Sequence, residues 1–554
     1  MKTIRYSKII LWLVVSALVL ASCGQPTAEP TSAAPTQNPF AGLNLVVPQR
    51  YDPPIEMHSV ISVDATVKFL GEDTIENNVW TRAYEELLGI KVTYDWVVDA
   101  STYNQKLNLS INSGDIPDMF LVRPEQLLLY QEAGLLADLT DVYEAETSEK
   151  TRDIMTQDPV ALKAATIGGK LWGLPVTDAA VATASVLWVR QDWMDKLGIA
   201  APTSMADVLE ISRRFTEDDP DGDGAKDTIG LCVSKSLFGA SSGLQGFFNG
   251  YHAYPGMWFE RDGKLVYGSV QPEMREALLA LQTMYASGQL DQEFGVKDVN
   301  AVNQTIAQGK CGMEFGVWWN PYHPLSLSQQ NDPDAFWSAF AIPSVDATPA
   351  KSQYSTAIGS FLVVRNDYEH PEALIRMANF WNDNLIGSQD EAVRGTFLGN
   401  LEAPDVVLYK YTNVLFWEPN AAIKAGNKLR DALANRDPSG LDLEAQWRYR
   451  IIQAYFEQGT KEAWVEVATN GPNGSSAILM EILGDRGLLN RFYGPPTPTM
   501  ATKLPNLQSM ESEMLIKVII GEPIEAFDKF TADWYSLGGT EIVDEVNQWA
   551  AQNP

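Results

Sequence analysis

Strand-like and helix-like segments alternate along the N-terminal part of this chain, and that alternation constrains the fold more than any other feature. Residues 60–70 and 90–96 show the two-residue alternation of strands, and 117–122 is a short apolar run. Between them, 80–88 and 103–114 carry apolar residues at helical spacing. Because strand–helix–strand units connect right-handedly, this order predicts an α/β fold in which a parallel sheet has helices on both faces.

The composition is that of a large, acidic, globular protein. Of 554 residues, 45% are apolar and 20% are charged, which suits a chain that buries a core. At roughly 100–200 residues per domain, this length predicts three or four domains, or two large lobes. The net charge of −30 repels phosphate backbones and argues against a nucleic-acid partner. With four histidines and three cysteines, the chain has neither a zinc framework nor a disulfide-dense scaffold.

The first 22 residues have the parts of a bacterial export signal. A basic start precedes an apolar run over 9–20, which is too short to span a bilayer comfortably. The run ends in Leu-Ala-Ser-Cys, which resembles a bacterial lipobox. We therefore expect 1–22 to be a signal peptide and Cys23 to carry a lipid; the alternative is an ordinary signal peptide with a chance cysteine.

The segment after Cys23 supports the lipid anchor. From Gly24 to Pro54 it is rich in Pro, Thr, Ala and Ser and has no helical or strand period, and we expect 23–57 to be a flexible tether. No later run of about 20 apolar residues occurs, so the lipid would be the only membrane attachment. The predicted location is the outer face of the cytoplasmic membrane.

Two cysteines remain if Cys23 is lipidated. Cys232 and Cys311 could pair in the oxidising exterior or stay buried and reduced. The sequence does not decide between these states, and we expect them to be unpaired.

A set of sequence segments, taken in order, carries a family resemblance. In the first half they read ELLGIKVTYDW, YNQKLNLSINSGDIPDMFLV, GLLADLTDVY, IGGKLWGLPV and LWVRQDWMDKLGIAAPTSMADVL. In the second half they read DGKLVYGSVQPEMREALLALQTMYASGQLDQEF, GKCGMEFGVWW and FYGPPTPTMATKLPNLQ. This set resembles extracellular solute-binding proteins of family 1, the receptors of carbohydrate ABC importers such as maltose-binding and alginate-oligosaccharide-binding proteins. No single segment is diagnostic, but the ordered set is.

The resemblance implies a periplasmic-binding-protein-like clamp of two α/β lobes with a hinge and a central ligand cleft. It assigns 58–176 to lobe one and 177–343 to lobe two. Residues 344–407 are expected to return to lobe one, with a strand over 356–364. The remaining segment, 408–554, is expected to be a helical section that packs mainly on lobe two.

The most specific local motif is an acidic loop at 219–230. Acidic residues at its positions 1, 3, 5 and 9, with glycine at position 6, match the start of an EF-hand-type calcium loop. The alternative is a solvated acidic turn, since position 12 is a glycine rather than the bidentate glutamate. Similar loops in the resembled family hold calcium, which implies a structural calcium site away from the ligand. The expected ligands are Asp219, Asp221, Asp223, Asp227 and the carbonyl of Ala225.

Tryptophan, at 16 residues, is the unusual surplus. Because the flat C–H faces of sugars pack on aromatic rings, exposed tryptophans are candidate ligand contacts. By resemblance, Trp318 and Trp319 follow a strand that ends at the cleft, and Trp258 and Trp172 are further candidates. Four tryptophans in helical patterns are expected in the core instead: Trp80, Trp193, Trp381 and Trp534.

Polar residues in loops before a helix or after strands are weaker candidates for the cleft. Glu76 and Asn77 precede the first predicted helix, and Arg123 and Asp178 follow predicted strands. An exposed loop residue is the default interpretation for each of them. A G-x-S-x-G match at 239–243 lacks framed acid and histidine partners, so we expect a Gly/Ser loop rather than a catalytic nucleophile.

The predicted function is that of a lipid-anchored receptor, with no catalytic residues, that delivers a carbohydrate to an ABC permease. An oligosaccharide is favoured over a monosaccharide by size and family, and a monomer is expected. The alternatives are a sensor or adhesion lipoprotein of the same fold and, less favoured, a secreted glycoside hydrolase, whose paired carboxylates no sequence spacing reveals.

Overall fold

The first sheet collects its five strands from three separate parts of the chain. Its order is β2-β1-β3-β14-β6. The strands are β1 (Ile55–Ser62), β2 (Ile90–Val98), β3 (Met119–Val122), β6 (Leu174–Pro175) and β14 (Phe361–Val364). β1 runs parallel to β2 and β3, as the strand–helix–strand pattern predicts, but β14 is antiparallel to both β3 and β6. The sheet is therefore mixed rather than parallel throughout.

The computed structural model describes residues 39–63, 67–158, 160–177, 180–355, 359–399 and 406–553. The chain divides into two units, 1–43 and 44–554. Everything below concerns the second unit. Cys23 and Asp178 lie outside the described residues, as do residues 356–358 of the predicted return strand.

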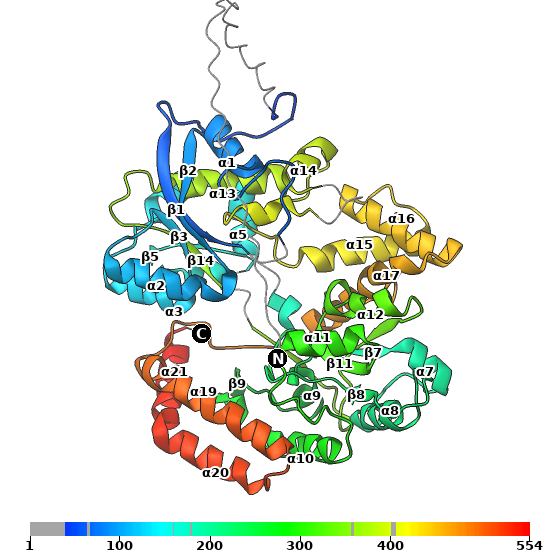
Figure 1. The fold of residues 1–554 in the computed structure, drawn as a ribbon. Helices are drawn as coiled ribbons and strands as arrows, with labels where there is room; N and C mark the ends of the chain where they lie inside the picture. Colours follow the sequence, from blue (N-terminus) through cyan, green and yellow to red (C-terminus); the bar gives the residue numbers. More distant parts are fainter. Residues whose placement is uncertain are drawn as a thin grey trace, which may run out of the picture. The chain divides into compact units, whose positions relative to one another are not determined.

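Lobe one is the first sheet with the helices around it, seen in blue, cyan and olive in Figure 1. Its helices are α1 (Val79–Ala83), α2 (Tyr103–Ser113), α3 (Pro124–Glu132), α4 (Thr140–Glu146), α5 (Glu149–Gln157), α6 (Ala161–Ala164), α13 (Glu372–Leu385) and α14 (Glu391–Phe397). α1 continues as a wider turn to Leu88 and ends at Gly89, whose φ is 68°. An added Cβ at Gly89 would lie 2.5 Å from the carbonyl oxygen of Tyr51, so this position requires glycine.

The folded body starts earlier than the sequence suggests. β1 begins at Ile55, inside the tether predicted to reach residue 57. The Val46 amide already donates to Asn384, and the Tyr51 hydroxyl donates to Glu372 at 2.8 Å. The predicted tether is therefore too long at its C-terminal end, because Pro/Thr/Ala/Ser richness fades gradually whereas packing begins at particular side chains.

Lobe two is built on a second sheet of order β12-β7-β11-β8. Its strands are β7 (Ser185–Arg190), β8 (Ile229–Leu231), β11 (Cys311–Val317) and β12 (Trp337–Phe340). β11 is parallel to β8 but antiparallel to β7. The helices of this part are α7 (Gln191–Leu197), α8 (Met205–Glu217), α9 (Gln245–Gly250), α10 (Glu273–Ala286), α11 (Val299–Ala307) and α12 (Ser326–Asn331).

Short strand pairs complete the sheet structure. They are β4 (Thr166–Ile167) with β5 (Lys170–Leu171), β9 (Trp258–Arg261) with β10 (Lys264–Tyr267), and β13 (Ser352–Tyr354) with β15 (Gly487–Leu489).

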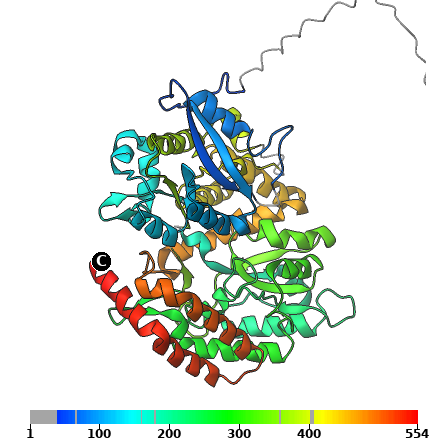
Figure 2. The same ribbon diagram turned by 60° about the vertical axis from the view of Figure 1, so that its left-hand side comes forward.

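The C-terminal section covers both faces of the second sheet. It consists of α15 (Ala421–Asn435), α16 (Leu443–Gln458), α17 (Trp464–Asn470), α18 (Ser475–Glu481), α19 (Pro498–Ile519), α20 (Glu525–Trp534) and α21 (Thr540–Gln552). Side chains of α19–α21 share one apolar cluster with α8 and α10, and α17 and α18 share another with Trp188 and Trp337. Figures 1 and 2 both show the orange and red helices beside the green elements of lobe two.

The first residues of that section pack on lobe one instead. The Leu408 carbonyl accepts from the indole of Trp80, and the Phe416 carbonyl accepts from the indole of Trp381. These two rings stack at 4.9 Å in the core of lobe one, as expected for core tryptophans. The predicted boundary at 408 therefore cuts through a segment that still belongs to lobe one.

Cys232 and Cys311 form a disulfide, with 5.9 Å between their Cα atoms. The expectation of two free thiols was wrong. Cys232 directly follows β8 and Cys311 begins β11, and because these strands pair in parallel the two side chains meet. A separation of 79 residues in the sequence hides this neighbourhood. A disulfide suits a protein outside the reducing cytosol.

Candidate functional site

A cavity of about 1240 Å³ opens between walls from both lobes. Lobe two contributes the end of β11 and the loop at 238–240, and lobe one contributes the end of α13 and part of α14. Helices α15 and α16 form a further wall. The cavity therefore lies where the two lobes meet, which is the place expected for the ligand of such a fold.

Aromatic rings line this cavity from several directions. They are Phe238, Trp318, Trp319, Tyr354, Tyr409 and Trp417. Trp319 has 38% of its surface exposed, while the indole N–H of Trp318 is buried with no partner among the described residues. Tyr409 and Trp417 pack edge to face at 5.3 Å. An open indole face suits the C–H face of a sugar, and an unpaired N–H offers a donor to a hydroxyl.

Five charged residues of the wall are held in ion pairs. Arg394 and Arg448 both contact Glu444, at 3.0 and 2.7 Å, and Lys424 contacts Glu418 at 2.7 Å. Burial alone would raise the pKa of Glu444, but the two guanidinium groups lower it below its ordinary value. These ion pairs fix hydrogen-bonding groups on the wall, as in a site that recognises hydroxyl groups.

Of the tryptophans predicted to touch ligand, the cavity takes Trp318 and Trp319 but neither Trp258 nor Trp172. Trp258 is 4% exposed and packs on Tyr267 at 5.3 Å, because β9 turns it toward the core of lobe two. Its neighbour Met257 faces the cavity instead. The indole of Trp172 donates to the Ile167 carbonyl in lobe one. The four tryptophans expected in the core are all at most 2% exposed.

The polar loop candidates of lobe one also lie elsewhere. Glu76, Asn77 and Arg123 are exposed and do not line the cavity. Asn77 accepts from Arg82, and the residue after it, Asn78, is the buried N-cap of α1. This turn serves helix capping, which explains its polar composition.

The sequence did not single out several wall residues. Tyr409 and Trp417 belong to an aromatic-rich stretch, 409–417, that could have been noticed. Arg394 and Glu444 come from helices 50 positions apart, and only the fold pairs them.

The acidic loop gathers its carboxylates as predicted, but around a lysine. The ligand atoms of Asp219, Asp221 and Asp223 lie within 4.8 Å of one another. Lys310, just before β11, donates from Nζ to Asp221 and Asp227 at 2.8 Å and to Asp223 at 2.7 Å. The oxygen donors fit a hard cation such as calcium, while the ammonium of Lys310 fills the space among three of them.

The rest of the loop is folded by its own hydrogen bonds. Asp219 accepts from the amides of Gly222 and Gly224, and Asp223 accepts from the amide of Ala225. The Thr228 hydroxyl, which stands where a further acidic ligand would help, instead donates to the Phe215 carbonyl at 2.6 Å. The six-oxygen shell of an EF-hand is therefore incomplete in this loop.

The lysine also sets the acidity of the loop. Its hydrogen bond, followed by that from the Ala225 amide, lowers the pKa of Asp223. At Asp221 burial is the largest single influence and acts to raise the pKa, but the hydrogen bonds from Lys310 and within the loop, together with the charge of Lys310, outweigh it, so that the pKa is lowered as well. The lowered pKa values favour the anionic forms of Asp221 and Asp223, with Lys310 as their counter-ion.

The family follows from the sequence as a whole. The sequence model of the bacterial extracellular solute-binding proteins matches residues 70–384, which is more than half of the chain. The chain belongs to the bacterial extracellular solute-binding protein family. The two-lobe α/β fold and the interlobe cavity agree with this assignment. No helix among the described residues is both long and apolar enough to cross a membrane.

Curated relatives of this solute-binding protein match over part of their length. Lipoprotein LipO of Bacillus subtilis is 26% identical over 42% of this chain and 45% of the relative. The fructooligosaccharide ABC transporter substrate-binding protein FusA of Streptococcus pneumoniae is 25% identical over 58% of each. The chain thus spans about half the length of the curated relatives it matches.

Solved structures extend the likeness in fold to nearly the whole molecule. An HMO-binding solute-binding protein of Bifidobacterium longum infantis superposes with a TM-score of 0.65 at 15% identity, over 90% of this chain and 98% of that one. FusA in complex with kestose gives 0.62 at 14% identity, over 90% and 99%. The alginate-binding protein AlgQ2 without calcium ion gives 0.60 at 14% identity, over 90% and 98%. These similarities establish the two-lobe fold of the solute-binding protein.

Proposed function

We propose that this chain is the lipid-anchored, extracellular substrate-binding protein of an ABC importer and that it captures a carbohydrate between its lobes. The observation that carries the proposal is the interlobe cavity with six aromatic side chains and hydrogen-bonding groups from both lobes. Aromatic platforms with fixed polar groups recognise sugars, and a cavity shared by two lobes lets hinge closure report occupancy to a permease. LipO and FusA, by name a lipoprotein and a fructooligosaccharide-binding protein, support this assignment.

The size of the cavity favours an oligosaccharide. Pockets for drug-sized ligands have volumes of about 300–1,000 Å³. The cavity, at about 1240 Å³, exceeds that range, and its rings are spread over several wall segments rather than gathered on one. A ligand of several sugar units would reach more than one aromatic platform at a time.

The protein is proposed to bind without catalysis and to act as a monomer held at the membrane through Cys23. Glu444, on the cavity wall, is paired with two arginines, so its carboxylate is held as a fixed anion. A general acid needs a carboxyl that stays protonated near neutral pH. The pairing of Glu444 therefore suits binding rather than glycoside hydrolysis.

The loop at 219–227 is proposed to take calcium only in competition with Lys310. Its acids offer the oxygen donors that calcium prefers, and two of the similar structures concern such sites by name, AlgQ2 without calcium ion and a FusA EF-hand mutant. Calcium would meet Asp219, Asp221, Asp223 and Asp227 once the ammonium of Lys310 has left. Its role there would be to hold the loop, apart from the ligand cavity.

A thermal-shift screen against a glycan library tests the main proposal. A ligand that binds only the folded chain raises the unfolding midpoint according to RT ln(1 + [L]/Kd). We expect oligosaccharides to raise it, and the shift to shrink in Trp319→Ala. Release of shorter sugars from the library would contradict the proposal and favour the glycosidase, while stabilisation by none of its glycans would contradict a carbohydrate ligand.

A further inference from the structure

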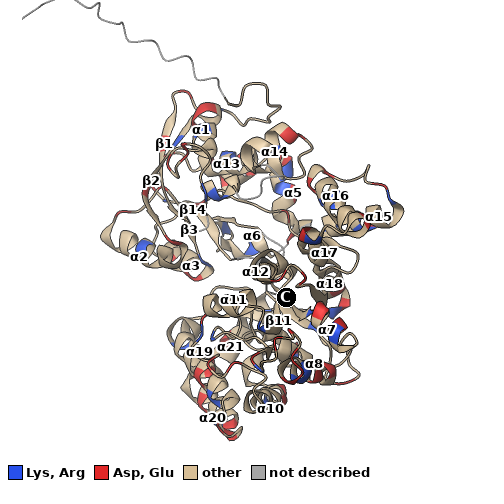
Figure 3. Ribbon diagram, turned by 45° about the vertical axis from the view of Figure 1, so that its right-hand side comes forward, with Lys and Arg blue, Asp and Glu red and all other residues tan. Residues whose placement is uncertain are grey.

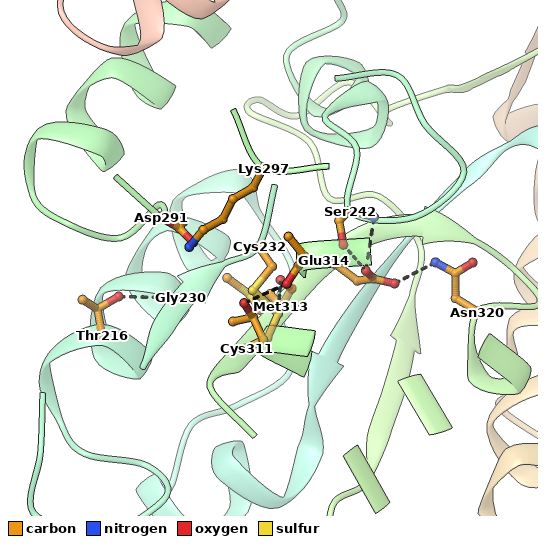
Figure 4. Close-up of a disulfide and its surroundings, with 12 residues drawn as sticks. Thr216, Gly230, Cys232, Ser242, Asp291, Lys297, Cys311, Met313, Glu314 and Asn320 are labelled. Carbon is orange, nitrogen blue, oxygen red and sulfur yellow. Dashed lines mark hydrogen bonds and ion pairs between the residues drawn. A yellow bond between two sulfur atoms is a disulfide. The ribbon is translucent and has the colours of Figure 1, made fainter. Parts of the chain in front are cut away.

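Behind the cavity wall is a buried carboxylate that has no ion-pair partner in the part of the chain that the structure describes. Glu314, in the middle of β11, has no exposed surface. Its Oε2 accepts from the backbone amide of Ser242 at 3.1 Å and from the Ser242 hydroxyl at 2.7 Å, and its Oε1 accepts from the Asn320 side-chain amide at 2.7 Å. Figure 4 shows Ser242 and Asn320 on opposite sides of this carboxylate. A buried anion satisfied by neutral donors alone is unusual enough to require a role.

The two donors belong to two different walls of the cavity. Ser242 ends the loop whose residues 238–240 line it, and Asn320 follows Trp318 and Trp319 directly. The walls also meet through backbone bonds, from the Val317 amide to the Ala240 carbonyl at 2.9 Å and from the Gly243 amide to the Phe315 carbonyl at 3.1 Å. Glu314 is thus the side chain that joins both walls at their base.

The backbone is shaped to allow this arrangement. Ser242 has a φ of 50°, in the left-handed region, which directs its amide and hydroxyl to the same carboxylate oxygen. An added Cβ at Gly316 would lie 2.0 Å from the Asn320 amide nitrogen, so glycine there leaves room for Asn320 to reach Glu314. The G-x-S-x-G match at 239–243, whose motif serine is Ser241, therefore forms a wall loop that is tied to Glu314 through the next residue, Ser242.

We propose that Glu314 is a positioning residue of the ligand cavity: its carboxylate holds the 238–243 loop and the Trp318–Trp319 segment in one arrangement. The inference rests on the proposed function for its link to ligand, but the wall arrangement itself does not. The aromatic rings of a sugar site must stay in register with one another, since a site that is loose by about 1 Å loses affinity.

The surroundings of Glu314 make the clamp sensitive to pH. Burial raises its pKa to about 7, while the hydrogen bonds from Ser242 and Asn320 act to lower it. Its strand neighbour on β7 is the neutral Trp188. On adjoining segments, the His323 imidazole pairs with Asn303 and Lys297 pairs with Asp291. Neither His323 nor the ion pair of Lys297 with Asp291, all among the described residues, contacts the carboxylate of Glu314.

The pH dependence separates positioning from plain structural support. The hydrogen bonds favour the ionised form, so they are strongest above pH 7 and weaken as Glu314 takes up a proton. Global stability moves in the opposite direction, because protonation removes the penalty for burying the charge. As pH falls from 8 to 5.5, wall openings that leave Glu314 buried should therefore become easier, while the contribution of Glu314 to the free energy of unfolding rises.

Hydrogen–deuterium exchange of the full chain, corrected for intrinsic rates at each pH, tests this without any ligand. In the wild type, we expect protection of peptides covering 238–244 and 315–321 to fall about tenfold between pH 8 and pH 5.5, the scale of one charge-assisted hydrogen bond. In Glu314→Gln, whose amide cannot accept from both sides, these peptides should exchange fast at both pH values.

Glu511→Gln is the matched control. Glu511 is also buried, with its pKa likewise raised to about 7 by burial, but its partner is Tyr267, away from the cavity. This variant should leave the wall peptides and their pH dependence unchanged. Equal protection at both pH values in the wild type, or faster exchange throughout lobe two in Glu314→Gln, would overturn the proposal. If Glu314→Gln does not fold, Asn320→Ala must free the 315–321 peptide for the proposal to stand.

Discussion

The ammonium of Lys310 lies 2.8 Å from a carboxylate oxygen of Asp221. Asp221 belongs to the acidic loop whose sequence pattern is that of a calcium site. Two further aspartates, Asp223 and Asp227, complete the contact. Lys310 precedes β11 and the loop precedes β8, so the parallel pairing of these strands brings the lysine to the acids. The charge that a metal would supply is thus partly supplied by the chain, and the loop has a counter-ion when metal is absent.

The first prediction concerns this counter-ion. Lys310→Met should lower the thermal midpoint in chelator, because the loop's carboxylates then repel one another, and calcium should restore it. At a calcium concentration of a hundred times Kd, binding to the Lys310→Met variant should raise its free energy of unfolding by about 2.7 kcal/mol. In the wild type the same calcium concentration should give a smaller shift, because calcium must displace the ammonium. Differential scanning calorimetry with calcium and with chelator measures both.

Lys196→Met is the control for that experiment. The Lys196 ammonium donates to the Pro220 carbonyl in the same loop without contacting its carboxylates. Its calcium response should equal that of the wild type. Equal calcium shifts in the wild type and in Lys310→Met would contradict competition.

The second prediction concerns the aromatic wall. Trp319→Ala should weaken binding of the glycan found by the thermal-shift screen by about 1–3 kcal/mol, or roughly fivefold to 150-fold, as for other aromatic hot spots. Isothermal titration calorimetry measures the change. Trp172→Ala, at a tryptophan outside the cavity, should bind normally. Normal binding by Trp319→Ala would place the stacking site on another wall, with Trp417 the next ring to test.

The third prediction concerns the membrane. Cys23→Ala should move the protein from the membrane fraction to the soluble extracellular fraction, because a lipid is its proposed attachment. Fractionation at high salt followed by immunoblotting shows the distribution. A variant that still sediments with membranes at high salt would mean that something other than lipid holds it.

The fourth prediction concerns pH and global stability. Burial raises the pKa of Glu511 from 4.5 to about 7. Between those values the native state holds a proton that the unfolded state has lost, so the free energy of unfolding falls as pH rises from about 4.5 to about 7. Glu511→Gln removes this contribution and should stabilise the protein at pH 8 by up to about 3 kcal/mol. Denaturant unfolding at pH 5 and pH 8 measures it; an equal pH dependence in both proteins would contradict the assignment.

The fifth prediction concerns the disulfide. Replacing Cys232 and Cys311 together by alanine releases a closed loop of about 80 residues in the unfolded state. Loop-closure entropy predicts a loss of about 4–5 kcal/mol in the free energy of unfolding. Denaturant unfolding under non-reducing conditions should show it. If the variant and the reduced wild type unfold at the same midpoint, the loss belongs to the disulfide and not to packing around alanine.

Local patterns in the sequence were sufficient where the physics is local. The helix that begins beside Asn78 and ends at Gly89, and the strand that follows it, agree with spacing, capping and a left-handed glycine. The strand before it was placed too late, since the sequence predicted 60–70 and β1 covers Ile55–Ser62. The acidic loop follows from spacing as well, since its carboxylates converge within nine residues. The tryptophans at helical spacing are buried for the same reason, because a stripe of large apolar side chains on one helix face must pack against a core.

Relations between distant residues were decided only by the tertiary structure. The contact of Asp221 with Lys310 and that of Ser242 with Glu314 could not be predicted from neighbouring residues, because strand pairing brings each pair together across more than 70 residues. The same holds for Cys232 with Cys311, and for Trp258, whose inward orientation depends on the pairing of β9. The sequence by itself determined the family, the elements and the acidic loop, since these depend on neighbours along the chain. The fold decided which charges, thiols and rings meet, since burial and partnership are properties of packed surfaces.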